Sequence, residues 1–156
     1  MIHFSVTIYT DGSCHTQLKL GAWAAIILHG DDKKILRGTT TDTTHQRMEL
    51  TAAIEAIKFV QFHYPSSKEI YLISDSQYVV DLPGRMEKLS ISNFCTRVGK
   101  PIQNSALVQQ LYQLCKSSNI IFTKVKAHLK MTGLDDYNIE VDKLCRKLVR
   151  EMVNIQ

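Results

Sequence analysis

The chain has 156 residues, 44% of them hydrophobic, which suits a single domain over residues 1–156 with a sizeable core. Its 19 Lys and Arg against 15 Asp and Glu give a net charge of +4, compatible with a polyanionic partner but not diagnostic of one. The sequence has no membrane-length apolar stretch, no secretion signal and no Cys-x-x-Cys metal motif, so we expect a cytoplasmic protein with reduced thiols and no membrane partner.

The first part of the chain predicts three strands. Residues 3–10 alternate apolar and polar side chains, as a half-buried strand does, and Asp11-Gly12 is expected to end this strand in a turn. Residues 21–28 and 33–41 are also strand-like, with a short polar turn between them. The simplest pairing is an antiparallel hairpin that extends the first strand into a three-stranded meander.

A helix is predicted from about Thr44 to Phe62, because apolar residues recur there at helical spacing and Thr43 or Thr44 is placed to cap it. Residues 69–74 then read as a short buried strand whose C-terminal end carries Asp75. A helix between two strands implies a crossover connection, so this strand should lie parallel to the first one.

The last part of the chain begins with a stretch of weak periodicity at residues 82–101, which we expect to form loop and short helix. A helix at 104–116, a strand at 120–126 and a helix at 136–153 follow. This order predicts an α/β fold: a mixed five-stranded sheet, three antiparallel strands and then two parallel ones, with helices packed on both faces.

Four acidic residues have candidate functional positions, although each also has an ordinary explanation. Asp11 suits a surface turn, and Asp75 suits a helix cap. Asp142 is spaced to pair with Arg146 one helical turn later. Glu49 can lie at a helix edge, but it shares a face with small apolar residues, where an ionised carboxylate is costly without a partner.

Taken together, the carboxylates indicate a metal site. If the first and fourth strands are parallel neighbours, Asp11 and Asp75 emerge at one sheet edge, with Glu49 on the helix between them. Clustered carboxylates repel unless cations bind, and hard oxygen ligands suit Mg²⁺ or Mn²⁺. Two such ions about 4 Å apart can activate a water and stabilise the leaving oxygen in phosphodiester cleavage.

Six sequence blocks resemble type 1 ribonuclease H, in that family's order and over nearly the whole chain. They are TDGSC (10–14), GAWAAIIL (21–28), RMELTAAIEAI (47–57), SDSQYV (74–79), VKAH (125–128) and NIEVDKL (138–144). The resemblance implies a ribonuclease H-like fold and an endoribonuclease that hydrolyses the RNA strand of RNA–DNA hybrids. It further implies a two-metal-ion mechanism with two Mg²⁺ per site, Mn²⁺ as a possible substitute, and a monomeric enzyme.

The resemblance also assigns roles to the candidate catalytic residues. It implies that Asp11 bridges the two ions, that Glu49 and Asp75 complete one metal site, and that Asp142 helps to hold the other. His128, in the VKAH block, matches a mobile-loop histidine of the family that is thought to assist proton transfer or product release.

Substrate contacts are implied in the same way. The positions that match the family's contacts to sugar edges in the minor groove, where 2′-hydroxyls distinguish RNA from DNA, are Cys14, His45, Gln46 and Gln77. Thr44 and Arg47 are expected to serve phosphate contacts or helix capping. Asn138 matches an asparagine four residues before the last aspartate, placed to support the water or phosphate network.

The chain departs from the family pattern in several places. HTQLKL follows Cys14 where a Gly- and Pro-rich turn is common, His45 replaces a frequent asparagine, and residues 128–142 form a longer segment than in compact members. Residues 79–100 replace a basic, tryptophan-rich protrusion of many bacterial members, without any Trp. Their cations are Arg85, Lys88, Arg97 and Lys100. Fewer cations predict weaker hybrid binding with a shallower salt dependence.

Two other functions stay open at this point. A catalytically inactive nucleic-acid-binding domain of the same fold is one, although it would have no reason to keep all four carboxylates. The other is a related nuclease that acts on another nucleic-acid substrate, such as a transposase, a Holliday-junction nuclease or a reverse-transcriptase-associated domain. The VKAH block and the complete set of carboxylates favour the ribonuclease.

Overall fold

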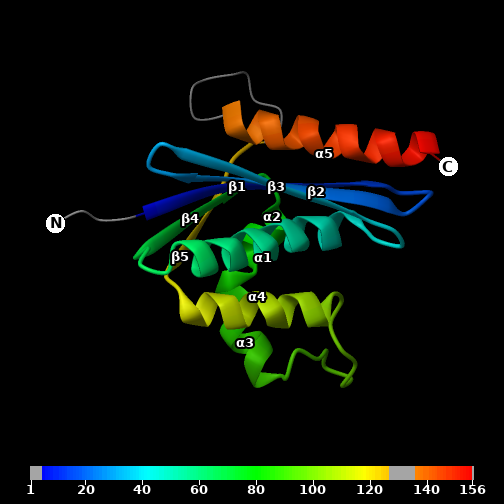
Figure 1. Cartoon of the computed structure of the whole chain (residues 1–156). Coiled ribbons are helices and arrows are strands. Elements are labelled where there is room, and N and C mark those ends of the chain that lie inside the picture. Colours follow the sequence, from blue (N-terminus) through cyan, green and yellow to red (C-terminus); the bar gives the residue numbers. More distant parts are fainter. Residues whose placement is uncertain (1–4, 127–135, 156) are drawn as a thin grey trace.

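The computed structural model describes residues 5–126 and 136–155, and its centre is a five-stranded sheet in the order β3-β2-β1-β4-β5 (Figure 1). The strands are β1 (Ser5–His15), β2 (Leu20–His29), β3 (Asp32–Thr40), β4 (Glu69–Ser74) and β5 (Ile120–Lys124). β1, β2 and β3 pair antiparallel, whereas β4 pairs parallel with both β1 and β5. The predicted mixed sheet is therefore confirmed.

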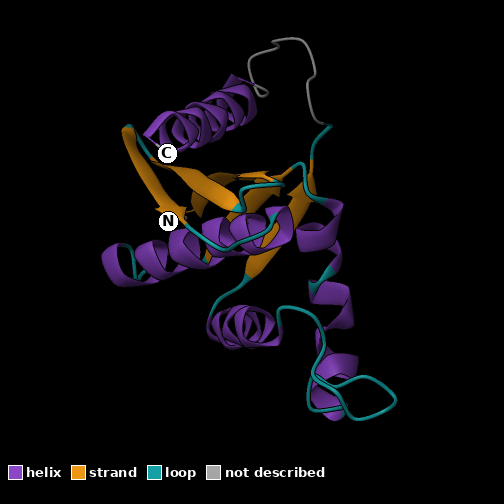
Figure 2. Cartoon of the chain, turned by 90° about the vertical axis from the view of Figure 1, so that its right-hand side faces the viewer, coloured by secondary structure: helices purple, strands orange, loops and turns teal. Residues whose placement is uncertain are grey.

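Helices cover both faces of this sheet. They are α1 (His45–His63), α2 (Gln77–Asp81), the short 3₁₀ helix η1 (Pro83–Arg85), α3 (Met86–Ile91), α4 (Ser105–Ser117) and α5 (Asp136–Ile155). α5 lies on one face, while α1 lies on the other with α4 packed beyond it (Figures 1 and 2). No helix within residues 5–126 and 136–155 is long and apolar enough to span a membrane.

Strand alternation decides which helix each side chain of β1 meets. Val6 and Ile8 are fully buried in the larger core, together with residues of α1 and α4. Tyr9 points the other way, into a smaller core with Val141 and Cys145 of α5. Because side chains alternate along a strand, Asp11 is on the α5 side, like Tyr9.

Thr44 caps α1, since its hydroxyl accepts a hydrogen bond from the backbone N–H of Arg47 at 3.2 Å. This bond satisfies one of the free amide groups in the first turn and decides between the two predicted caps. Thr43 is instead buried, with 2% of its surface exposed, against Gly21.

The predicted end of β1 at Asp11-Gly12 is wrong. β1 continues to His15 and pairs across β2, with Asp11 opposite Ala24 and Gly12 opposite Trp23. Gly12 is required by packing, because a Cβ atom there would lie 2.5 Å from the backbone nitrogen of Glu49. The missing side chain thus lets the start of α1 approach the strand closely.

The stretch after α2 consists of η1, α3 and a loop, as predicted. A single bridge between Cys95 and Pro101 and a bond from the Ile102 N–H to the Phe94 carbonyl close this loop. The ring of Phe94 packs edge-on against Tyr112 of α4, with centroids 5.6 Å apart. The segment is therefore anchored on α4, at a distance from the sheet (Figure 1).

Candidate active site

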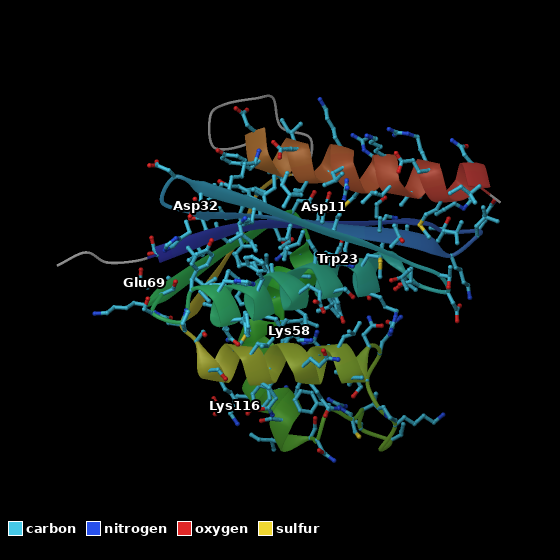
Figure 3. The ribbon with its side chains drawn as sticks, viewed as in Figure 1. Asp11, Trp23, Asp32, Lys58, Glu69 and Lys116 are labelled. Carbon is cyan, nitrogen blue, oxygen red and sulfur yellow. The ribbon has the colours of Figure 1, made fainter. Side chains whose placement is uncertain are left out.

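The site begins where β1 and β4 part. Their parallel pairing ends at Thr10 and Ser74, so the next residues are Asp11 on β1 and Asp75 directly after β4. Asp11 is 6% exposed and lies on the α5 side of the sheet (Figure 3). Its backbone carbonyl also accepts a hydrogen bond from the Cys145 thiol of α5 at 3.4 Å. The predicted meeting of Asp11 and Asp75 at one sheet edge is confirmed.

Glu49 reaches the same edge from α1. Close packing of Gly12 against the backbone of residues 48 and 49 holds the first turns of α1 on β1. At the other end of the side chain, Glu49 Oε2 accepts a hydrogen bond of 2.6 Å from the Ser76 hydroxyl. Glu49 is therefore held at its backbone by β1 and at its carboxylate by the residue that follows Asp75.

Electrostatics show that the carboxylates affect one another. The pKa of Asp11 is raised from 3.8 to about 8, mainly by burial and then by the charge of Asp75, with smaller increases from Asp142 and Glu49. A hydrogen bond from the Gly12 N–H to Asp11 Oδ1 opposes this rise only in part. The charges of the other three candidate ligands thus all reach Asp11.

The pKa of Glu49 is also raised, first by burial and also by the charge of Asp75. The hydrogen bond from Ser76 and the nearby His45 lower it. A raised pKa means that the negative charge is not fully compensated by the surrounding protein. A bound cation would supply this compensation.

Asp142 enters the site from α5 and has a partner of its own. Its Oδ2 lies 2.7 Å from Nη2 of Arg146 in an i,i+4 ion pair, and its side chain is 21% exposed. The ordinary explanation of this residue, a half-exposed ion-pair partner, is therefore present in the structure. Its charge nevertheless reaches Asp11, so the ion pair does not remove Asp142 from the site.

The described part of the chain contains no group of three or more His, Cys, Asp and Glu side chains already arranged around a metal position. The donor chemistry fits a hard divalent cation all the same, since the donors are carboxylates, and burial together with mutual repulsion raises the pKa of Asp11 and Glu49. The residues that would hold such ions are Asp11, Glu49, Asp75 and Asp142.

The predicted substrate residues on β1 and α1 differ in their exposure. His45 and Arg47 are exposed in the first turn of α1, Gln46 is half-buried, and Thr44 serves as the cap. Cys14 is buried, and its thiol donates to the Thr43 carbonyl at 3.5 Å. The side chains in the first turn of α1 could therefore face a sugar edge with less rearrangement than the buried side chain of Cys14.

Two further predicted residues have constrained environments. Gln77 is exposed at the start of α2, where its Oε1 accepts from Lys124 Nζ at 2.7 Å and its Nε2 donates to Asp81 at 2.6 Å. Asn138 is 4% exposed, and its Oδ1 accepts no hydrogen bond from the described residues. His128 lies outside the described residues.

Sequence reasoning missed two residues at this site. Ser76, and not Asp75, is the N-cap of α2, with its hydroxyl accepting from the Val79 N–H at 3.2 Å. The signal was the serine directly after the aspartate at a helix start, a favoured cap type. Lys124, at the end of β5, orients Gln77, and no sequence pattern indicates that contact.

The chain matches the RNase H family model over residues 3–150. It is 36% identical over 148 residues to the ribonuclease H of Chlorobium luteolum, covering 94% of this chain and 96% of that protein. The chain belongs to the ribonuclease H family. The ribonuclease H of Ehrlichia chaffeensis is a further relative, 35% identical over 92% of this chain and 94% of its own length. The expectation of a hydrolytic nuclease of this family is confirmed.

Solved structures of ribonucleases H have the same fold. LC9-RNase H1, described as a type 1 RNase H with the type 2 active-site motif, superposes with a TM-score of 0.81 at 20% identity, over 97% of this chain and 74% of that one. LC11-RNase H1, solved in complex with an RNA/DNA hybrid, gives a TM-score of 0.70 at 16% identity, over 95% of this chain and 99% of that one. At these identities the likeness demonstrates the shared fold.

Proposed function

We propose that this ribonuclease H cuts the RNA strand of RNA–DNA hybrids with the help of two divalent ions, Mg²⁺ or in its place Mn²⁺. The observation that carries the proposal is the environment of Asp11, a carboxylate at the sheet edge whose pKa is raised by its burial and, further, by the charges of three other carboxylates. Membership of the ribonuclease H family and the hybrid bound to LC11-RNase H1 support the choice of substrate.

The four carboxylates have different tasks in this proposal. Asp11, whose pKa responds to burial and to the charges of the other three, would bridge two ions. Glu49 and Asp75 would complete one metal site, and Asp142 of α5 would help to hold the other. When bound, two ions of this type activate a water for attack on the scissile phosphate and stabilise the leaving oxygen. Burial of Asp11 limits the access of bulk water to its own carboxylate.

Recognition of the hybrid is proposed for the exposed and half-buried polar groups beside this edge. His45 and Gln46 lie in the first turn of α1, and Gln77 opens α2 directly after the Asp75–Ser76 segment. Contacts to 2′-hydroxyls from such groups would distinguish the RNA strand from DNA. His128 remains a prediction for proton transfer or product release.

The test is cleavage of an end-labelled RNA–DNA hybrid beside single-stranded RNA, double-stranded RNA and duplex DNA. Each substrate is incubated with Mg²⁺, with Mn²⁺ and with EDTA. We expect internal cuts in the hybrid RNA strand that depend on the metal, and little cleavage of the other three. The proposal fails if no metal concentration produces hybrid-specific cleavage.

The two alternative functions give different results in the same assay. An inactive binding domain would retain the hybrid in a gel-shift experiment but leave its RNA intact. A nuclease for another substrate would cut duplex DNA or a branched junction in preference to the hybrid. The monomeric state and the cytoplasmic location remain predictions.

A further inference from the structure

The Ser76 hydroxyl has two partners on different segments. It lies 2.6 Å from Glu49 Oε2 of α1 and 3.2 Å from the backbone nitrogen of Val79 in α2. Ser76 is 6% exposed, so solvent competes little for either bond. A single buried oxygen therefore joins the start of α2 to a candidate metal ligand.

The direction of these two bonds follows from the chemistry of the hydroxyl. A serine hydroxyl has one proton to donate and lone pairs to accept with. The Val79 N–H is a donor, so the hydroxyl oxygen must accept there, and its single proton is left for the Glu49 carboxylate. Hydrogen bonds to an ionised carboxylate are short and strong, in keeping with the observed 2.6 Å.

The backbone around Ser76 is also held. Its N–H donates to the Ser74 hydroxyl at 3.0 Å, and Ser74 is 2% exposed at the end of β4. Asp75 lies between these two serines, so the turn that carries Asp75 is the same turn that holds Glu49. Ser76 therefore joins the Glu49 carboxylate to the turn that carries Asp75.

We propose that Ser76 is a positioning residue for metal binding: its hydroxyl holds Oε2 of Glu49 next to the Asp75 segment and leaves Oε1 to face an ion. This inference rests on the proposed metal-dependent function. Partners of metal ligands that lie in the second layer around an ion typically change metal affinity or activity by roughly 10- to 100-fold when removed.

Three substitutions separate this role from helix capping. Ser76→Ala removes both the proton donor and the cap. Ser76→Gly also removes the donor, but glycine costs an N-cap only a few tenths of a kcal/mol relative to serine, so α2 is largely spared. Ser76→Thr keeps both functions. Ser117→Ala is the matched control, because it removes a hydroxyl that donates to the Gln113 carbonyl on the exposed side of α4.

Metal binding is measured without nucleic acid, as the Mg²⁺ concentration that gives half of the maximal increase in Tm. Hybrid cleavage is then measured against Mg²⁺, with kcat and KM for the hybrid determined separately. We expect the Ala and Gly variants to need roughly tenfold more Mg²⁺ in both assays, with the hybrid KM at saturating Mg²⁺ unchanged. Ser76→Thr and Ser117→Ala should stay within about threefold of the wild type.

The inference is overturned if the Ala and Gly variants bind Mg²⁺ like the wild type. It is also overturned if only Ser76→Ala is impaired, because loss of the helix cap would then explain the effect. If the Ala variant fails to fold, the Gly and Thr variants decide in the same way. The wild-type arm reports on the proposed function separately. If the wild type neither binds Mg²⁺ nor cuts the hybrid, the proposed function and the role of Ser76 both fail. If the wild type is active and the Ser76 variants behave like it, only the role of Ser76 fails.

Discussion

Gly12 of β1 and Glu49 of α1 are in such close contact that a Cβ atom on Gly12 would lie 2.5 Å from the backbone nitrogen of Glu49. No pair of non-bonded heavy atoms of this kind tolerates that distance, so a side chain at position 12 must push α1 away from the sheet. The contact links the stability of the fold to the placement of two candidate metal ligands. Glu49 is in the contact itself, and Asp11 directly precedes Gly12.

Gly12→Ala is therefore expected to damage both stability and activity. Overpacking of this kind costs about 1–3 kcal/mol, and a displacement of a catalytic group by 1 Å can reduce the rate about 100-fold. Urea unfolding and hybrid cleavage measure the two effects. Gly84→Ala is the matched control for stability, since a Cβ at Gly84 meets nothing within 4 Å. Equal stability of the two variants would contradict the packing argument.

Asp11→Asn is expected to change how the stability of the metal-free protein depends on pH. The folded chain raises the pKa of Asp11 from 3.8 to about 8, so between these values it keeps a proton that the unfolded chain has lost. Stability should consequently fall as the pH rises from about 4 to about 8. The asparagine variant lacks this loss and should be more stable than the wild type at pH 8, on the order of 5 kcal/mol, at about 1.4 kcal/mol for each pKa unit.

Urea unfolding in EDTA at pH 5 and pH 8 measures this difference. Asp31→Asn, at an exposed turn, controls for the general loss of a carboxylate. Saturating Mg²⁺ should restore the stability of the wild type at pH 8 but not alter Asp11→Asn. A wild type that is as stable at pH 8 as at pH 5, with no gain in the variant, would show that folding does not raise the pKa of Asp11.

Asp142→Asn separates catalysis from the ion pair seen in the structure. If Asp142 only pairs with Arg146, the substitution should cost about 0.3–0.5 kcal/mol and little activity. We expect instead that cleavage falls by about 100-fold or more while Tm changes little, because a metal ligand is lost. Arg146→Gln is the control: it breaks the same pair but keeps the carboxylate, and should remain active. Similar activity of both variants would favour the purely structural role.

The salt dependence of hybrid binding tests the segment from α2 to α4. Lys88 and Arg97 line a surface pocket of about 460 Å³ there, together with Arg85. Substitution of Lys88 or Arg97 by Ala should lower the slope of log affinity against log salt by about 1 if that residue neutralises a phosphate. Lys58→Ala is the control, since Lys58 already lies 3.7 Å from Glu55 on α1. A wild-type salt slope as steep as that of a tryptophan-rich relative would contradict the predicted weaker binding of the hybrid.

Much of the architecture was predictable because it depends on patterns within short segments. Alternation and helical periodicity placed α1, β4 and α5 to within about two residues, and the helix between two strands made β4 parallel to β1. Local patterns misled at Asp11-Gly12, where typical turn residues lie inside β1. A turn preference takes no account of a helix backbone that packs onto the strand.

The sequence by itself determined the family, the order of the elements and the identity of the four carboxylates, because motif blocks and hydrophobic periods are properties of neighbouring residues. Only the tertiary structure decided how these residues are held. Ser76 meets Glu49 across 27 residues and Cys145 meets the Asp11 carbonyl across 134, distances along the chain at which no local pattern operates. The charge repulsion that raises the pKa of Asp11 likewise exists only once β1, β4, α1 and α5 share one edge.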